Sequence, residues 1–145
     1  MTYQHVEMSH AQVDEFLQKP RFAVIGTVRR KGAPQLTPVW YLYENGLVYV
    51  SMSINSAKYR NLTRDPRVCI CMAEQYPDAR AVMIHGEVEL IPEESAWSDD
   101  IHWRLTRRYH GSDEEAQAFL DSFPTEEKSA LVSITPDKVI AEDWN

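Results

Sequence analysis

The chain has 145 residues, of which 43% are hydrophobic and 26% charged, and its 22 acidic and 15 basic side chains give a formal charge of −7. A chain of this length buries roughly two-thirds of its unfolded surface without disulfides or metal ions, so we expect a single domain over residues 1–145. The acidic balance argues against nucleic acid as a partner, because such binding needs a wide positive field.

No apolar run approaches the about 20 residues that a membrane-spanning helix needs, so no membrane partner is expected. The segment from Met1 to Glu7 lacks the basic and apolar regions of a secretory signal, which favours a cytoplasmic address. Cys69 and Cys71 are the two cysteines, and their spacing in a strand predicts one shared, buried face. Neither a disulfide nor a metal site is expected, since a structural zinc needs two more ligands.

The first element expected is a short amphipathic helix over residues 9–18, which Ser9 can cap and Pro20 follows. Strands are then predicted over residues 22–30, 35–44, 47–53, 67–73 and 80–90. Asn45-Gly46 is the strongest hairpin signal, because this dipeptide accepts the positive φ angles of a tight turn. A polar helical turn is predicted over residues 55–65, and Gly86 is a candidate β-bulge.

Residues 92–128 are rich in acidic side chains and are predicted to form two helices. The first ends near Gly111 and the second covers residues 112–123, ended by Pro124. We expect them to pack on the rest of the fold through Trp97, Ile101, Leu105 and Phe119. A final strand pair is predicted over residues 130–136 and 138–144. Six or seven short antiparallel strands predict a small closed or partly closed barrel, which removes exposed strand edges.

Basic side chains gather in residues 55–67, whereas the rest of the chain is strongly acidic. Lys58 and Arg60 fall in the first turn of the predicted helix, where the helix dipole disfavours cations unless an anion is bound. With exposed backbone N–H groups and the Ser56 hydroxyl, they suit a phosphate or a polycarboxylate. The alternative is a solvated helix face paired with the acidic residues of 93–128, and charge alone favours neither.

Four segments occur in a defined order: residues 22–27 (FAVIGT), 32–40 (GAPQLTPVW), 45–51 (NGLVYVS) and 56–62 (SAKYRNL), followed by DPRV at 65–68. In this order they resemble the pyridoxamine 5′-phosphate oxidase-like, FMN-binding split-barrel superfamily. The resemblance is closest to its small deazaflavin-dependent branch, which uses coenzyme F420. It covers about residues 10–90, and the C-terminal strand pair fits more loosely.

The resemblance implies a mainly β fold with helices: a six-stranded antiparallel split β-barrel of Greek-key topology, with an N-terminal helix and a C-terminal helical insertion. It also implies a homodimer with the cofactor in a groove at the dimer interface. The cofactor is F420 in the first place and FMN in the second, since both have a tricyclic ring and an anionic tail. The implied function is an oxidoreductase that transfers a hydride between this cofactor and a small organic substrate.

Carried onto this chain, the resemblance places the phosphate-bearing tail against Lys58, Arg60 and Asn61, with two serines beside it on the preceding strand. The segment from Thr37 to Trp40 would lie along the ring system, mostly through backbone groups. The candidate cofactor-binding residues are Thr37, Pro38, Val39, Trp40, Ser51, Ser53, Ser56, Lys58, Arg60 and Asn61. The sequence identifies no catalytic side chain.

Other interpretations remain for single residues and for the function. Pro38 cannot donate within a β-ladder, so it favours an edge or bulged position, and Trp40 with Tyr41 also suits core packing. His102 and His110 are about 12 Å apart along a helix, too far for one metal ion. Hydrolase, P-loop and Rossmann motifs are absent from the sequence. The second class of function is a non-catalytic protein that stores, carries or senses a flavin or haem on the same barrel.

Overall fold

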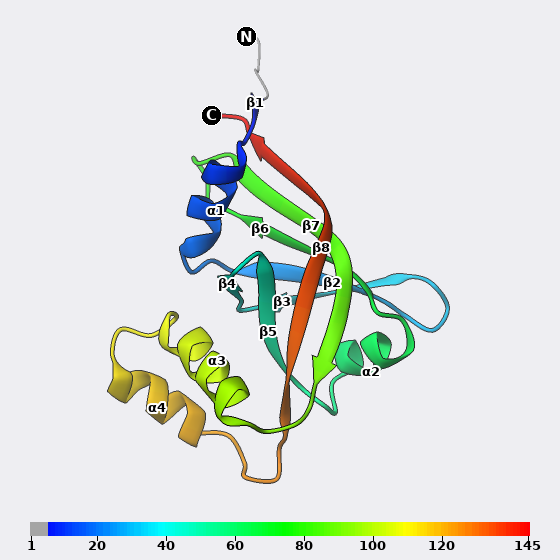
Figure 1. Cartoon of the computed structure of the whole chain (residues 1–145), viewed down its shortest axis with the longest axis vertical. Helices are drawn as coiled ribbons and strands as arrows, with labels where there is room; N and C mark the ends of the chain where they lie inside the picture. Colours follow the sequence, from blue (N-terminus) through cyan, green and yellow to red (C-terminus); the bar gives the residue numbers. More distant parts are fainter. Residues whose placement is uncertain (1–5) are drawn as a thin grey trace.

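One antiparallel sheet, curled on itself, carries most of the chain in this computed structural model, which describes residues 6–145 (Figure 1). The strands are β1 (Val6–Glu7), β2 (Ala23–Val28), β3 (Pro34–Val39), β4 (Leu42–Glu44), β5 (Leu47–Ser53), β6 (Arg67–Ala73), β7 (Arg80–Ile91) and β8 (Ser129–Asp143). The helices are α1 (His10–Gln18), α2 (Ala57–Arg64), α3 (Ala96–Arg107) and α4 (Asp113–Asp121). The expected class, mainly β with helices, is confirmed.

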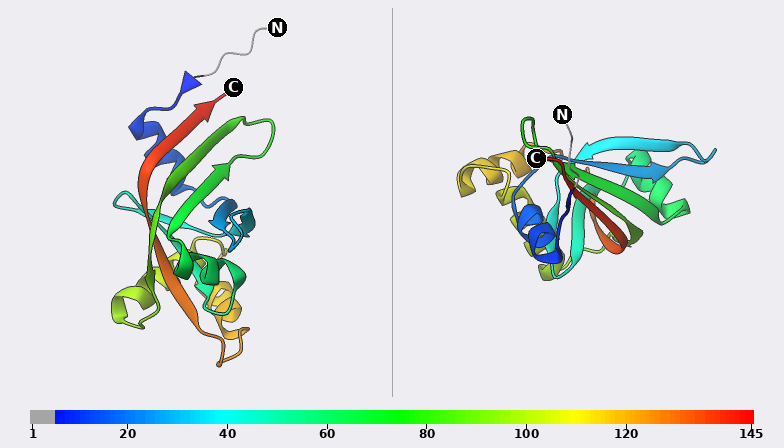
Figure 2. Two further views of the ribbon diagram at one scale, coloured as in Figure 1. Left: turned by 90° about the vertical axis from the view of Figure 1, so that its right-hand side faces the viewer. Right: turned by 90° about the horizontal axis from the view of Figure 1, so that it is seen from above.

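The order of strands in the sheet is β3-β2-β6-β7-β8-β5-β4, and β1 pairs with β8. Only Trp40 and Tyr41 separate β3 from β4 along the chain, so the two ends of the sheet are held near each other and the sheet must curl. Helices α1 and α2 pack on the core inside the curled sheet, whereas α3 packs on the outer face of β5 and β8 with α4 beside it (Figures 1 and 2). The part of the chain that the structure describes contains no helix long and apolar enough to span a membrane.

The expected number of six strands is wrong, for two reasons. The stretch 35–44 is divided into β3 and β4, because the chain turns a corner at Trp40 and Tyr41 from one end of the sheet to the other. The expected C-terminal pair is a single strand, β8, because pairing with β7 continues on both sides of a bulge. The path therefore contains seven strands, with β1 as an eighth beside it.

The bulge lies where Gly86 pairs with Pro136 while His85 pairs with Lys138, which leaves Asp137 as an extra residue on β8. This confirms the expected irregularity at Gly86. A Cβ atom at this position would lie 2.1 Å from the Thr135 carbonyl oxygen, so only glycine allows the two strands to approach this closely. The hairpin at Asn45 and Gly46 is also as predicted, with φ angles of 51° and 76°.

The core lies inside the curled sheet, where alternate residues of each strand are buried and α1 closes one end. Its largest fully buried side chains include Tyr41, Leu17, Ile25, Ile70, Met72, Ile84 and Ile134. A strand alternation shows which residues share a face but not which face is inside. Cys69 and Cys71 share a face as predicted, but they are half-exposed on the outside of β6 and not buried, because Val68, Ile70 and Met72 point into the core.

Candidate functional site

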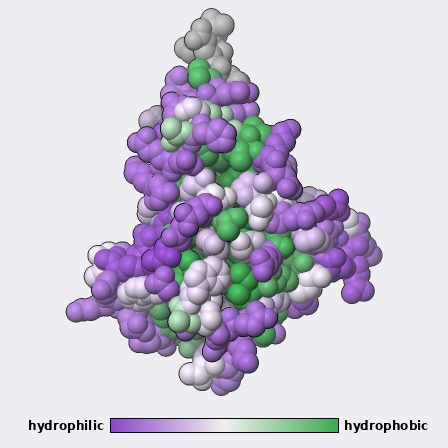
Figure 3. Space-filling model, viewed as in Figure 1, coloured by the Kyte–Doolittle hydropathy of each residue, from purple (hydrophilic) through white to green (hydrophobic). Residues whose placement is uncertain are grey.

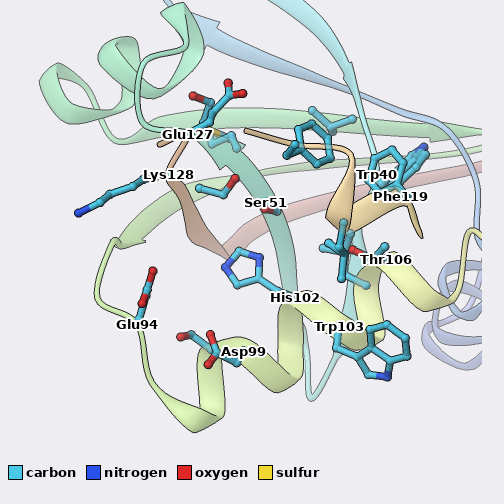
Figure 4. Close-up of a pocket in the computed structure, with 18 of the residues that line it drawn as sticks. Trp40, Ser51, Glu94, Asp99, His102, Trp103, Thr106, Phe119, Glu127 and Lys128 are labelled. Carbon is cyan, nitrogen blue, oxygen red and sulfur yellow. The ribbon is translucent and has the colours of Figure 1, made fainter. Parts of the chain in front are cut away.

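A cavity of about 940 Å³ lies between the sheet and the α3–α4 insertion (Figure 4). One wall consists of the end of β3 and the second half of β5. The other wall consists of α3 and the segment that runs from α4 to the start of β8. Small-molecule sites in proteins occupy roughly 300–1,000 Å³, so this cavity is large enough for a cofactor-sized ligand.

Trp40 is the aromatic wall of the cavity at the corner between β3 and β4. Its indole is stacked on the Tyr109 ring at 4.8 Å between centroids and 9° between planes, and the Phe119 ring lies 5.0 Å away. Tyr41, the next residue, is fully buried in the core and donates a hydrogen bond to the Lys19 carbonyl oxygen at 3.0 Å. The two adjacent aromatic residues therefore have different roles, one lining the cavity and one packing in the core.

Helix α3 is attached to the sheet through apolar residues on one face. Ile101 and Leu105 are 1% and 3% exposed, and Ile101 packs with Tyr49 and Leu131 on the outer face of β5 and β8. Trp97 packs less closely than expected, because half of its side chain, 50%, is exposed. It lies in the first turn of α3, at the margin of this small cluster, and touches the Tyr49 ring edge-on at 6.0 Å.

Polar contacts attach the C-terminal end of the same helix. The Tyr109 hydroxyl donates to the Arg21 carbonyl oxygen at 2.6 Å and accepts from the Tyr41 backbone N–H at 3.2 Å. The Arg108 guanidinium donates to the carbonyl oxygens of Tyr41 and Gln18, each at 2.9 Å. These contacts hold the insertion over the cavity and against the corner that carries Trp40.

We predict that Tyr109→Phe lowers the free energy of unfolding by about 1–3 kcal/mol, because it leaves the backbone N–H of Tyr41 and the carbonyl group of Arg21, both buried residues, without this partner. Chemical denaturation followed by circular dichroism measures the change. Tyr76→Phe is the matched control, since Tyr76 is 92% exposed. Equal stability of the two variants would contradict the proposed attachment of α3.

Lys58 and Lys128 are the two cations that line the cavity, and Lys128 is exposed to solvent. Lys58 is the one held in the wall. It lies in the first turn of α2, is half-buried, and forms no ion pair with any residue of the described chain. Burial lowers the pKa of its amine below the ordinary value, and no carboxylate opposes this effect. An unpaired cation in such a position gains free energy from a bound anion.

The structure brings together part of the expected cofactor-binding set. Pro38, Val39, Trp40, Ser51, Ser53 and Lys58 line the cavity, whereas Thr37, Ser56, Arg60 and Asn61 do not. Pro38 lies in β3, at an end of the sheet path, which is the edge position expected for it.

Three of the residues outside the cavity lining have structural partners. Ser56 caps α2 by accepting from the Tyr59 N–H at 3.2 Å. The Arg60 guanidinium donates to the Asn55 carbonyl oxygen at 2.7 Å. Asn61 is buried, and its amide donates to the Thr27 hydroxyl and the Gln35 side chain, both at 3.0 Å, which fastens α2 to β2 and β3.

Helices α3 and α4 contribute residues to the cavity that were not among the expected site residues. His102 and Thr106 each follow one position after the buried residues Ile101 and Leu105, so they flank the buried stripe of α3. Burial lowers the pKa of His102, and the weaker opposing effect of Asp99 does not restore it, so the site favours the neutral imidazole. The helical spacing of Ile101 and Leu105 could have indicated that their neighbours flank a buried stripe. Spacing alone does not show which flank of the helix faces a cavity.

The sequence pattern of the pyridoxamine 5′-phosphate oxidase family matches residues 9–142. Among solved structures, the conserved hypothetical protein Rv2991 from Mycobacterium tuberculosis is similar, with 27% identity and a TM-score of 0.80 over 95% of this chain and 86% of the other. An F420 reductase has 20% identity and a TM-score of 0.67, covering 87% and 94% of the two chains.

The haem storage protein HutZ from Vibrio cholerae has 16% identity and a TM-score of 0.73, with 94% and 96% covered. The last two likenesses, at low identity, concern the fold alone. The match to the family pattern extends from the start of α1 to the end of β8 and so includes every wall of the cavity. The chain therefore belongs to the pyridoxamine 5′-phosphate oxidase family, in the split-barrel superfamily.

Proposed function

We propose that the protein binds a flavin-type cofactor in this cavity and transfers a hydride between the cofactor and a small organic substrate. F420 is the first candidate, since the motif order resembles the deazaflavin branch and an F420 reductase shares the fold, and FMN is the second. The observation that carries the proposal is the unpaired, half-buried Lys58 in a cavity with the aromatic wall of Trp40 and Phe119. The cation suits an anionic tail, and a cavity with this lining suits planar groups, with the cofactor ring beside Val39 and the wall of Trp40 and Phe119 left for the substrate.

The residues of the chain bind and orient this cofactor. Lys58 pairs with the anionic tail, and the hydroxyls of Ser51 and Ser53 lie on the same wall. Strand β3 pairs with β2 alone in the described sheet, so one row of its backbone groups is available to hydrogen-bond a ring placed beside Val39. When bound, the cofactor supplies the hydride chemistry, and the insertion of α3 and α4 limits access of water.

Titration of the purified protein with F420 and with FMN, followed by cofactor fluorescence, tests the proposal. We expect saturable quenching by at least one of the two, and oxidation of the reduced cofactor when an electron acceptor such as menadione is added. Absence of saturable binding for both would refute the proposal. Binding without oxidation in the presence of any acceptor would instead favour the non-catalytic alternative.

We propose further that the protein is a homodimer with the cavity at its interface. The outer face of β2 and β3 carries Phe22, Leu36 and Val24, which are 74%, 69% and 39% exposed. Phe22 and Pro38 belong both to this surface and to the cavity lining, so the two are continuous. Hydrophobic residues also reach the surface over the long strands on the face seen in Figure 3, whereas the helices are mainly hydrophilic. Monomers rarely expose a contiguous apolar patch of this kind.

We predict that Leu36→Glu converts the dimer to a monomer at micromolar concentration, because the substitution places a charge within the apolar interface. Size-exclusion chromatography with light scattering measures the mass. Tyr76→Glu is the control, since Tyr76 is 92% exposed but lies in the loop between β6 and β7, outside the strands. A wild-type protein that is itself monomeric would refute the dimer.

A non-catalytic haem or flavin carrier is the second candidate. The shared fold with a haem storage protein and the neutral His102 imidazole in the cavity both favour it, since neutral imidazole is a common axial ligand of haem iron. Titration with hemin, followed by the Soret absorption, tests it. A shifted Soret band in the wild type that is lost in His102→Leu would support haem binding at this residue.

A further inference from the structure

Three polar residues line the cavity where α3 faces β5, and the cofactor proposal above uses only Ser51 among them. His102 and Thr106 lie one helical turn apart on α3, and Ser51 lies on β5 opposite. Figure 4 shows the His102 ring extending from α3 toward the strand that carries Ser51, with Thr106 beside Trp40 and Phe119. We call Ser51, His102 and Thr106 the polar trio.

The side chains of the polar trio have no hydrogen-bond partner within the described chain. This matters most for Thr106, which is only 6% exposed, since buried hydroxyls in proteins are nearly always hydrogen-bonded. Among the described residues, every side-chain polar atom that is shielded from solvent has a hydrogen-bond partner. The Thr106 hydroxyl has no such partner, so it must be open to solvent, and the opening is the cavity that this residue lines. A ligand in the cavity is the natural partner of such a group.

The surroundings of the polar trio indicate the chemistry of that ligand. Trp40, Leu105 and Phe119 provide apolar and aromatic walls next to Thr106. The charged side chains of Glu94 and Asp99 lie on the far side of His102 from Trp40 (Figure 4). The trio itself therefore offers neutral hydrogen-bonding groups beside a flat apolar surface.

We propose that the polar trio is the substrate subsite of the cavity and binds an uncharged carbonyl or hydroxyl oxygen on a planar, mainly apolar molecule packed against Trp40 and Phe119. The name substrate rests on the function proposed above, which assigns the cofactor tail to Lys58. The neutral imidazole of His102 both donates and accepts, and the two hydroxyls do the same, so the trio suits either kind of oxygen. The exposed carboxylates of Glu94 and Asp99 disfavour an anionic substrate, and the amines of Lys58 and Lys128, which line the same cavity, disfavour a cationic one.

Calorimetric titration with three probes on the same naphthalene ring tests the subsite: 2-naphthol is neutral, 2-naphthoate is an anion and 2-naphthylmethylamine is a cation. The full chain is used, with and without saturating FMN. We expect the wild type to bind 2-naphthol at least about fivefold more tightly than either charged probe. Equal or tighter binding of 2-naphthoate or of 2-naphthylmethylamine would overturn the proposed ligand class.

Substitutions then test the residues. His102→Leu and the nearly isosteric Thr106→Val are each expected to weaken 2-naphthol binding about three- to tenfold, as expected for loss of one hydrogen bond. His102→Gln and Thr106→Ser, which retain polar groups, should remain within about twofold of the wild type. His10→Leu is the control, since His10 is exposed on α1 and lies outside this cavity. Unchanged affinity in both His102→Leu and Thr106→Val, with native circular dichroism, would overturn the subsite.

The cofactor proposal and the subsite fail in different ways. Lys58→Ala should weaken cofactor binding and leave 2-naphthol affinity within about twofold. If the wild type binds neither F420 nor FMN but shows the expected pattern for 2-naphthol, the cofactor proposal is refuted and the ligand subsite stands. If both cofactors bind and the substitutions leave 2-naphthol affinity unchanged, the subsite is refuted and the cofactor proposal stands.

Discussion

Lys58→Ala is expected to weaken binding of F420 or FMN roughly ten- to a hundredfold. The reason is the loss of a charge-assisted contact to the anionic tail, which is worth about 1.5–3 kcal/mol. Fluorescence titration of the variant and the wild type measures the change directly. The free energy of unfolding without cofactor should not fall, because Lys58 has no ion-pair partner in the described chain whose contact would be lost.

Two neighbouring substitutions show whether position or charge alone matters. Arg67→Ala removes the same charge from an exposed side chain that pairs with Asp65, so cofactor affinity should stay within about twofold. Arg60→Ala should have a smaller effect than Lys58→Ala, because the Arg60 guanidinium contacts the Asn55 carbonyl oxygen outside the cavity lining. Equal losses of cofactor affinity for Lys58→Ala and Arg67→Ala would show that only the net charge of the protein matters. That result would contradict the assignment of Lys58 to the cofactor tail.

The pH dependence has opposite signs for stability and for binding. Burial favours the neutral amine, so the pKa of Lys58 is lower in the folded chain than the ordinary 10.5. At a pH below the pKa of the folded chain, the amine is charged in both the folded and the unfolded chain, so folding carries the full cost of desolvating the charge. As the pH rises from the pKa of the folded chain to that of the unfolded chain, this cost is relieved and the free energy of unfolding increases. Cofactor affinity should instead decrease as Lys58 loses its proton in the alkaline range, and Lys58→Ala should remove this decrease.

Gly86→Ala is expected to lower the free energy of unfolding by about 2–4 kcal/mol. The added Cβ would lie 2.1 Å from the Thr135 carbonyl oxygen and 3.3 Å from the Pro136 Cα, both backbone atoms of the bulged partner strand. Neither can move without disturbing the pairing of β7 with β8, the longest ladder of the sheet. Urea denaturation of the two proteins, with equal slopes, measures the difference.

Gly26→Ala is the matched control within the same sheet. Its added Cβ would meet the end of the Leu36 side chain at 3.2 Å and the Cys69 carbonyl oxygen at an ordinary 3.6 Å, and the Leu36 side chain can rotate away. We therefore expect a loss of less than about 1 kcal/mol. If Gly86→Ala also lowers the free energy of unfolding by less than about 1 kcal/mol, the prediction is contradicted. The two strands would then separate at the bulge more easily than the close approach of the added Cβ to Thr135 implies.

Local patterns in the sequence determined much of the secondary structure. The capping residue Ser9, the Asn45-Gly46 turn and the alternation within the strands each depend on neighbours along the chain. The structure has the helix and the hairpin that they predict, and the strands except for the divided stretch 35–44 and the C-terminal pair that is one strand. The order of the four motifs indicated the superfamily, because each motif is a continuous stretch of the chain. The cation at Lys58 was also recognisable, because a lysine in the first turn of a helix is unfavourable without an anion.

The tertiary structure alone decided which faces are inside and which distant residues meet. Cys69 and Cys71 share a face by their spacing, but pairing with β2 and β7 placed that face outside. Tyr41 and Trp40 are adjacent, yet the corner between β3 and β4 buries one and leaves the other against Tyr109 and Phe119. His102 and Thr106 became part of the cavity because α3 lies across β5, a contact between residues about fifty positions apart, and local sequence patterns carry no information about such contacts.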